Sequence, residues 1–334
     1  MSLKDKCKTL LEKIGRIMLK PQEKQLKALQ KQLKQQQALL GKQQELLEAQ
    51  QQTLNGLTRE LTCLRSRVQA LQPRCVVEGH PQIIVSVTSY PARINCVPDV
   101  IDNMLAQTLP PNRIILTLSE ENFPNKEADL PIRLLRHRAN GLEILWVKED
   151  LRSYKKLLPV MQLYPNDIFI TVDDDLIYPL TMIEQLCEAH RAFPHALCAM
   201  RTHKMEIDHD GKLRPYKTWE KHSGKHILEP RWDLFATTGA GTLFPPHVFG
   251  DEMFNREVFT ALSPSADDVW VKIMCMKYDV PVVLSGTPQP LQYMPDTQTE
   301  CLFKINKKAN DMQLAALTEH YGKEIWAKLM PKAE

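Results

Sequence analysis

The chain has 334 residues, of which 43% are apolar and 25% are charged, as is usual for a soluble globular protein. The 12 glycines and 23 prolines exclude collagen-like or low-complexity sequence as a description of the whole chain. The 8 cysteines form no C-x-x-C pair, which argues against a zinc site or a disulfide framework. Because no secretory-signal pattern is found either, we expect a cytoplasmic protein.

The charge is unevenly distributed, with +9 on residues 1–75 and −6 on residues 76–334. Residues 3–18 also place apolar side chains at helical spacing and lysines on the other face. We therefore expect residues 1–20 to form a basic amphipathic helix that contacts an anionic membrane peripherally, at the inner face of the cell membrane. A solvated helix face is the alternative, and nucleic acid is disfavoured as a partner because the body is acidic.

A seven-residue repeat follows and predicts a coiled coil over residues 21–75. One seam position holds Leu26, Leu33, Leu40, Leu47, Leu54, Leu61 and Val68, and the other holds Leu29, Gln36, Gln43, Gln50, Leu57, Leu64 and Leu71. Since one helix alone would leave this seam in water, we expect the segment to assemble a homo-oligomer. A single long polar helix is the alternative, and the number of strands is left open.

From Pro81 onward, the pattern predicts strands that alternate with helices. The expected strands are Ile83–Val87, Arg113–Leu118, Leu142–Val147 and Ile168–Val172, and the expected helices cover residues 97–107, 155–163 and 179–192. This order predicts an α/β domain over residues 76–334, with a mostly parallel sheet flanked by helices. Ligands of such sheets bind outside the carboxyl ends of the strands.

Three consecutive carboxylates, Asp173, Asp174 and Asp175, follow the last of these strands. They repel one another unless a metal ion or ammonium groups compensate them. Carboxylate ligands suit Mg²⁺ or Mn²⁺, and in an extended segment Asp173 and Asp175 would point the same way. The cluster therefore predicts a divalent metal site, with a simple acidic turn as the alternative.

Five motifs in this order resemble those of a bacterial sugar-nucleotide-dependent glycosyltransferase of the GT-A fold, similar to family 2 and to capsule or lipopolysaccharide enzymes. They are Ile83–Arg93, Ser153–Leu157, Asp167–Pro179, Thr237–Pro246 and Ala266–Val271. The resemblance covers about residues 80–315 and leaves the coiled coil outside. It implies a GT-A-like fold, a nucleotide-sugar donor and a metal ion.

The resemblance also implies where the donor binds. The loop with Thr88, Ser89, Tyr90 and Arg93 would face the nucleotide, with Arg93 on the diphosphate or, alternatively, in a surface salt bridge. One of Lys155 and Lys156 would lie near the nucleotide, and the other would be solvated. Asp173 would contact the ribose or base, and Asp175 together with Asp173 would bind the metal. Asp174 would orient its neighbours. Gly239 and Gly241 would line the donor sugar and the acceptor.

Asp267 and Asp268 precede an apolar, helix-like stretch. A carboxylate there can act as a general base on an acceptor hydroxyl. The resemblance favours Asp268 as this base, with Asp267 as the second choice and a helix N-cap pair as the alternative. A third metal ligand cannot be assigned from the motifs; Asn306, Asn310 and Asp311 are the only candidates.

Together these features predict an inverting, metal-dependent glycosyltransferase. A UDP-sugar is the favoured donor, and a glycan or lipid-linked hydroxyl of surface polysaccharide synthesis is the expected acceptor. A nucleotidyltransferase on a similar fold is one alternative, although the SVTSYPAR loop after the first strand has no glycine. A non-catalytic coiled-coil scaffold is the other, and the intact acids at residues 173–175 and 267–268 count against it.

Overall fold

The structure, a computed structural model, describes residues 7–8, 29–58, 81–221, 224–295, 297 and 302–329, with only the backbone for residues 302–308. The chain divides into two compact units, residues 1–61 and 62–334, and each is described by itself. The boundaries expected after residues 20 and 75 lie outside the described residues, as does most of the helix expected over residues 1–20.

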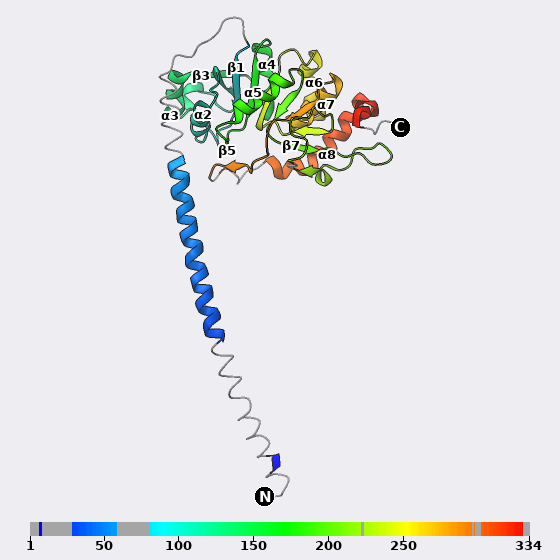
Figure 1. Cartoon of the computed structure of the whole chain (residues 1–334). Helices are drawn as coiled ribbons and strands as arrows, with labels where there is room; N and C mark the ends of the chain where they lie inside the picture. The colour runs from blue at the N-terminus through cyan, green and yellow to red at the C-terminus, as the bar shows by residue number, and fades with distance from the viewer. Residues whose placement is uncertain are drawn as a thin grey trace. The chain divides into compact units, whose positions relative to one another are not determined.

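In the first unit, residues 29–58 form one continuous helix (Figure 1). The predicted helix is thus confirmed over this range, whereas its pairing with a second helix stays a prediction. Several seam leucines are more than half exposed, namely Leu33 (56%), Leu40 (58%), Leu47 (68%) and Leu54 (57%). Among the helices that the structure describes, none combines the length and apolar character that a membrane-crossing segment requires.

The second unit is built on a sheet of seven strands in the order β11-β6-β10-β4-β1-β2-β3. The strands are β1 (Ile83–Thr88), β2 (Arg113–Ser119), β3 (Leu142–Val147), β4 (Ile168–Val172), β6 (Leu197–Ala199), β10 (Ala240–Phe244) and β11 (Val282–Leu284). β10 runs antiparallel to both β4 and β6, and the other pairings are parallel. The predicted α/β class with a mostly parallel sheet is therefore confirmed.

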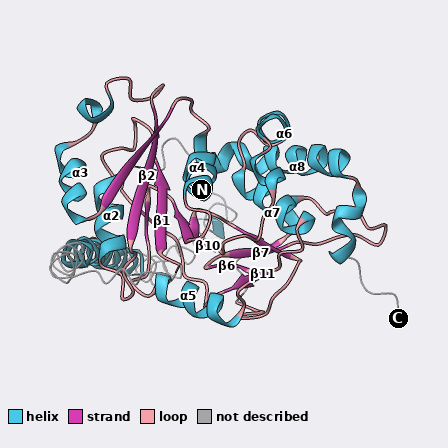
Figure 2. Ribbon diagram, turned by 90° about the horizontal axis from the view of Figure 1, so that it is seen from above, coloured by secondary structure: helices cyan, strands magenta, loops and turns pink. Residues whose placement is uncertain are grey.

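Both faces of the sheet are buried, because neighbouring residues of a strand enter different cores. In β4, Phe169 belongs to one buried cluster and Ile170 to the other. Helices cover both sides of the strands in Figure 2. They are α2 (Val97–Leu105), α3 (Ile132–Arg136), α4 (Leu158–Leu163), α5 (Met182–Ala192), α6 (Arg256–Leu262), α7 (Asp267–Lys277) and α8 (Leu302–Tyr321).

The helix boundaries differ from the prediction: α2 ends at Leu105 and not at residue 107, and α5 begins at Met182 and not at residue 179. The helix expected over residues 155–163 is a 3-10 turn, η3 (Arg152–Lys156), followed by α4 from Leu158. Pro159 stands in the first turn of α4, where its missing N–H leaves no helix hydrogen bond unmade. The other 3-10 segments are η1 (Lys126–Asp129), η2 (His137–Asn140), η4 (Tyr216–Thr218), η5 (Asp251–Phe254) and η6 (Lys323–Leu329).

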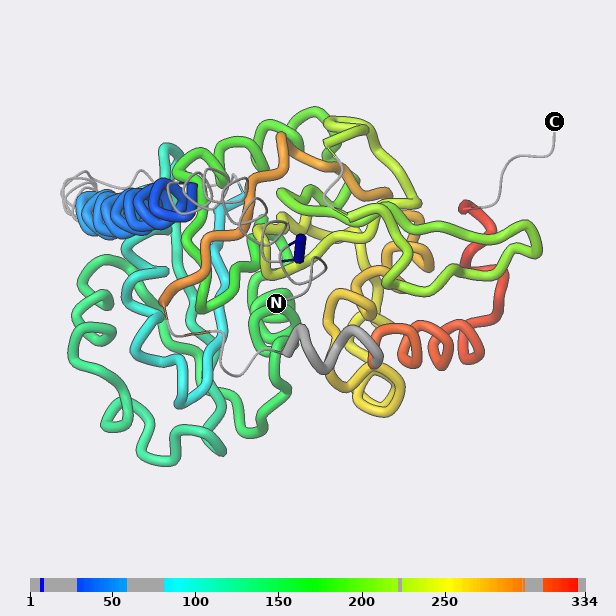
Figure 3. Tube along the Cα trace, turned by 90° about the horizontal axis from the view of Figure 1, so that it is seen from below, coloured from blue at the N-terminus to red at the C-terminus, as the bar shows by residue number. Residues whose placement is uncertain are grey.

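Two small sheets are separate from the large one. β5 (Leu176–Ile177) directly follows the acidic cluster and pairs with β12 (Gln292–Tyr293), which lies in the orange segment of Figure 3. β7 (Thr202–Lys204) pairs with β8 (Glu220–Lys221) and with β9 (Leu234–Ala236). These sheets hold the segments before β10 and after β4 in place.

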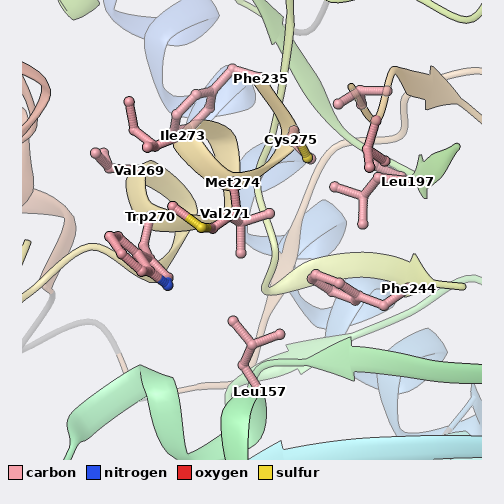
Figure 4. Packing of buried hydrophobic residues seen from close by; sticks show 14 of the residues in the cluster. Leu157, Leu197, Phe235, Phe244, Val269, Trp270, Val271, Ile273, Met274 and Cys275 are labelled. Atoms are coloured by element: carbon pink, nitrogen blue, oxygen red, sulfur yellow. The ribbon is translucent and has the colours of Figure 1, made fainter. Parts of the chain in front are cut away.

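Helix α7 is buried along most of its length, and its side chains pack with Leu157 and Phe244 (Figure 4). Trp270 is fully buried and its indole N–H donates to the carbonyl of Met253 at 3.0 Å. Trp270 is therefore a core residue.

Candidate functional site

The sheet topology brings three segments to one edge. β1 and β4 are parallel, so the residues after each strand, 89–93 and 173–175, meet at their carboxyl ends. β10 is antiparallel to β4, so the residues before it, Thr237–Gly239, reach the same edge. The backbone N–H of Asp173 donates to the carbonyl of Gly239 at 3.2 Å, which joins two of the segments directly.

Asp174 and Asp175 are both buried and share one guanidinium. Arg93 Nη1 lies 3.2 Å from Asp174 Oδ1 and 2.9 Å from Asp175 Oδ2. The hydroxyl of Ser89 donates to Asp174 Oδ2 at 2.5 Å. Burial raises the pKa of Asp174 despite these donors. The single positive charge of Arg93 thus compensates the two carboxylates only in part. The guanidinium also lies 5.6 Å from the ring centroid of Tyr90.

Asp173 points to different partners from its two neighbours, because residues 174 and 175 form a turn and the segment is not extended. Lys156 Nζ donates to Asp173 Oδ1 at 2.6 Å. The expectation that Asp173 and Asp175 face the same way is therefore wrong. The Asp173 side chain is 40% exposed, so it is the most accessible of the three carboxylates.

The two adjacent lysines are both buried, so the expectation that one of them is solvated is wrong. Lys155 is 1% exposed and Lys156 is 3% exposed. Lys155 Nζ donates to Asp150 Oδ1 at 2.5 Å, whereas Lys156 reaches the acidic cluster. The structure therefore distinguishes the two, and Lys156 is the lysine that faces the site.

A second acidic pair, Asp267 and Asp268, forms the first turn of α7, whose N-cap residue is Ala266. The Thr238 hydroxyl contacts Asp267 Oδ2 at 2.8 Å and Asp268 Oδ1 at 2.5 Å, and the Thr238 N–H donates to Asp268 Oδ1 at 2.9 Å. The acids therefore bind the loop before β10 and do not serve as an N-cap. Two effects raise the pKa of Asp268 to about 7: burial is the larger, and repulsion from the charge of Asp267 is the second.

Lys156 connects the two acidic groups. Its Nζ lies 2.6 Å from Asp173 Oδ1 and 3.7 Å from Asp267 Oδ2. Burial lowers the pKa of Lys156, but the charges of Asp173 and Asp267 outweigh this effect, and the net pKa is raised. Lys156 thus stays charged and holds the two groups beside each other.

The structure also gives the contacts of the other residues that the sequence predicted for the site. The Thr88 hydroxyl donates to the carbonyl of Thr117 at 2.7 Å. Gly239 lies against Asp173, since a Cβ there would be 1.8 Å from Oδ2. Gly241, with φ of +95°, packs instead against Met182. Of the third-ligand candidates, Asp311 accepts the N–H of Tyr216 at 2.7 Å, Asn310 is buried, and the Asn306 side chain lies outside the described residues.

Several residues of the site carried no recognised sequence signal. Tyr178 is buried, and its hydroxyl accepts the N–H of Asp173 at 2.7 Å and donates to Gly239 O. Arg201 follows β6, and its guanidinium donates to the Thr237 hydroxyl at 3.5 Å. Its position two residues after a strand that ends at this edge is the signal that could have identified Arg201.

The donor set suits a hard divalent cation, although no group of three His, Cys, Asp or Glu side chains is arranged for a metal in the part of the chain that the structure describes. Magnesium commonly takes one or two protein carboxylates and substrate phosphates, so a group of three is not required. The carboxylates at residues 173–175 and 267–268 outnumber the cations Arg93 and Lys156 that contact them. Asp173, with its accessible oxygen atoms, fits such an ion as it stands. The buried carboxylate of Asp175 would have to leave Arg93 and turn toward Asp173 to become a second ligand.

No protein-family model and no curated protein matches the sequence. Among solved structures, a mannosyltransferase from Pyrobaculum calidifontis in complex with GDP-Man and Mn²⁺ is 14% identical, with 81% of this chain and 85% of that chain covered and a TM-score of 0.40. Glucosyl-3-phosphoglycerate synthase from Mycobacterium tuberculosis is 12% identical, with 77% and 83% covered and a TM-score of 0.41. CMP:2-keto-3-deoxy-manno-octonic acid synthetase with CTP is also 12% identical, with 69% and 99% covered and a TM-score of 0.38. Neither the identities nor the TM-scores are high enough to assign the chain to a family.

Proposed function

We propose that the second unit is an inverting, metal-dependent glycosyltransferase that moves a sugar from a nucleoside-diphosphate donor to a hydroxyl of a glycan or lipid-linked acceptor. The observation that supports it most is the juxtaposition of two acidic groups with different surroundings. One group, with Asp173, can serve a metal-bound diphosphate. The other, with Asp268, can serve as a base, and Lys156 holds the groups together.

A metal ion would be held by Asp173 and by Asp175, whose carboxylate would first leave Arg93 and turn toward Asp173, and the ion would supply a Lewis acid for the diphosphate leaving group. The charge of the site supports this proposal. A diphosphate that approaches an edge with more carboxylates than cations meets repulsion unless another cation accompanies it. The Ser89, Tyr90 and Arg93 segment then faces the nucleotide, with Tyr90 as an aromatic surface.

Asp268 is proposed as the general base. Its raised pKa allows it to accept a proton from an acceptor hydroxyl near neutral pH. Thr238 orients this carboxylate through its hydroxyl and its N–H. Asp267 is more deeply buried and contacts both Thr238 and Lys156, so its role is to position the base.

The function is tested by calorimetry of UDP, GDP and CMP binding with and without Mn²⁺, for the wild type and two variants. Asp175→Ala should abolish the Mn²⁺-dependent binding, because one of the two proposed metal ligands is lost. Asp210→Ala is the matched control, since its carboxylate is exposed on a distant loop. Wild-type affinity in Asp175→Ala with Mn²⁺ would contradict the metal assignment.

The same protein is then incubated with UDP-sugars and, separately, with nucleoside triphosphates and sugar phosphates. Release of UDP from a UDP-sugar supports a glycosyltransferase. Release of pyrophosphate identifies a nucleotidyltransferase instead. If no nucleotide binds and neither product forms, the scaffold alternative is the correct one.

The helix of residues 29–58 is proposed to assemble the chain through a second copy of itself. Its exposed leucines repeat every seven residues, so two copies bury the same seam on each other. Leu39 (61% exposed) and Leu46 (62%) stand beside this seam and widen it. We also propose that the assembled basic segments contact an anionic membrane at its cytoplasmic face, because several copies bind far better than one.

A further inference from the structure

Tyr154 is a buried side chain of the η3 turn, and the chemistry proposed above gives it no role. It is 1% exposed, and its ring stacks on Phe259 of α6 with the ring centroids 4.5 Å apart. Its hydroxyl donates to the carbonyl of Ser263 at 2.6 Å and lies 3.3 Å from the carbonyl of Ala266. Because residues 263–266 join α6 to α7, the hydroxyl of Tyr154 holds the turn from which α7 starts.

The carbonyl of Ala266 fixes the first turn of α7. It accepts the N–H of Val269 at 3.1 Å and the N–H of Trp270 at 3.3 Å. The hydroxyl of Ser263 also donates to it, at 2.9 Å. The proposed base, Asp268, is the second residue of α7 and lies inside this turn. A shift of the Ala266 carbonyl would therefore move the carboxylate of Asp268 as well.

The η3 turn is attached to the sheet and contacts both acidic groups. The hydroxyl of Ser86, in β1, donates to the carbonyl of Lys156 at 2.6 Å. The ammonium of Lys156 donates to Asp173 Oδ1 at 2.6 Å. Tyr154, two residues earlier, contacts the turn before α7. One short segment thus sets the position of the start of α7 relative to the carboxylate that we assign to the metal.

We propose that Tyr154 is a positioning residue, which holds Asp268 in place beside the acceptor hydroxyl through its hydrogen bonds to the turn before α7. This inference rests on the proposed function. Tyr154→Phe removes the hydroxyl and keeps the ring that stacks on Phe259. Gln313 of α8 still donates to the Ser265 hydroxyl at 3.1 Å on the same turn. The variant should therefore fold, with a less firmly held start of α7.

The first test compares hydrogen exchange of Tyr154→Phe and Tyr164→Phe in the full chain. Tyr164 follows α4, and its hydroxyl donates at 3.2 Å to Glu143 on β3, a strand that carries no residue of the proposed site. Mass spectrometry should find exchange about tenfold faster over residues 263–270 in Tyr154→Phe only. An unchanged rate there, or an equal rise throughout the second unit, would overturn the proposal.

Steady-state kinetics then test the link to the base. Tyr154→Phe should lower kcat about tenfold and leave the donor KM and the UDP affinity unchanged, because only the base is displaced. In an Asp268→Asn background the same substitution should cause no further loss, since the base that it positions is already absent. An equal loss in both backgrounds would mean that Tyr154 acts independently of Asp268 and would overturn the proposal.

A wild type without transferase activity contradicts the proposed function instead. Hydrogen exchange over residues 263–270 then still decides whether the hydroxyl of Tyr154 holds the segment that carries Asp268. The two failures are thus distinguished, because exchange requires no substrate.

Discussion

The carboxylate of Asp173 lies directly over the Cα of Gly239, so that a methyl group on Gly239 would be 1.8 Å from Asp173 Oδ2. The Asp173 N–H donates to the Gly239 carbonyl, and Thr171, two residues earlier, donates to the Thr238 carbonyl at 2.7 Å. The backbone cannot move away without breaking these bonds. A side chain at position 239 would therefore displace the carboxylate that we assign to the metal.

Gly239→Ala should reduce Mn²⁺-dependent UDP binding by about tenfold or more, because it removes one charged ligand from its position. The variant is measured by calorimetry. Gly224→Ala is the control, since its Cβ would meet only Pro288 at an ordinary 3.8 Å. Normal metal-dependent binding in Gly239→Ala would show that the position of Asp173 does not matter for the nucleotide.

Asp268→Asn should lower turnover by about 100-fold or more and retain nucleotide binding, because the amide keeps the shape and removes the base. Since the pKa of Asp268 is raised to about 7, the base is protonated at lower pH, and wild-type turnover should fall as the pH drops below about 7. Steady-state rates across pH 5–9 measure this limb. If Asp267→Asn is inactive and Asp268→Asn turns over normally, the two roles must be exchanged.

Lys272 is 2% exposed and points from α7 to the backbone around β9, where its Nζ contacts Trp232 O and lies 3.0 Å from Leu234 O. Burial lowers the pKa of Lys272 to about 8. Between pH 8 and about 10.4 the unfolded chain therefore binds more protons than the folded one, and the wild type gains stability as the pH rises. Relative to Lys272→Met, this gain should be about 2 kcal/mol between pH 7.5 and pH 10.

Urea unfolding of both proteins at pH 7.5 and pH 10 measures that difference. Lys277→Met, which removes an exposed ammonium from the same helix, is the control. If the stability difference between wild type and Lys272→Met does not change with pH, burial does not lower the pKa of Lys272.

Leu40→Asp combined with Leu47→Asp should convert the oligomer to a monomer, because two charges enter the apolar seam. Light scattering gives the mass. Gln35→Asp with Ala49→Asp places the same charges away from the seam and should leave the mass unchanged. Activity should be retained in both, since the second unit is a separate compact unit. An oligomer that persists in the leucine variant would contradict assembly through the helix.

The membrane proposal predicts that the full chain floats with vesicles that contain anionic lipid and that this binding weakens with salt. Deletion of residues 1–20 should remove the binding, because their basic and apolar faces are lost. Neutral vesicles are the control. No flotation at low salt would refute membrane contact and leave the assembly proposal untouched.

The central strands could be predicted because each is a short, apolar run between turn residues. Leu142–Val147 and Ile168–Val172 have the same bounds in the structure as in the prediction. The start of α4 was less predictable, since Lys155 and Lys156 fit a helix by local propensity but form part of a 3-10 turn. In the structure Lys155 pairs with Asp150 and Lys156 with Asp173, and local propensity contains no information about these contacts.

The sequence by itself determined the α/β class, the two acidic groups and the heptad pattern, because these depend on local order and periodicity. Only the tertiary structure decided which side chains meet. Arg93 contacts Asp174, 81 residues away, and Thr238 contacts Asp267, 29 residues away. These contacts depend on strand order and on the reversed direction of β10, which bring distant segments to one edge, and the hydrophobic pattern of a single strand contains no information about its neighbours.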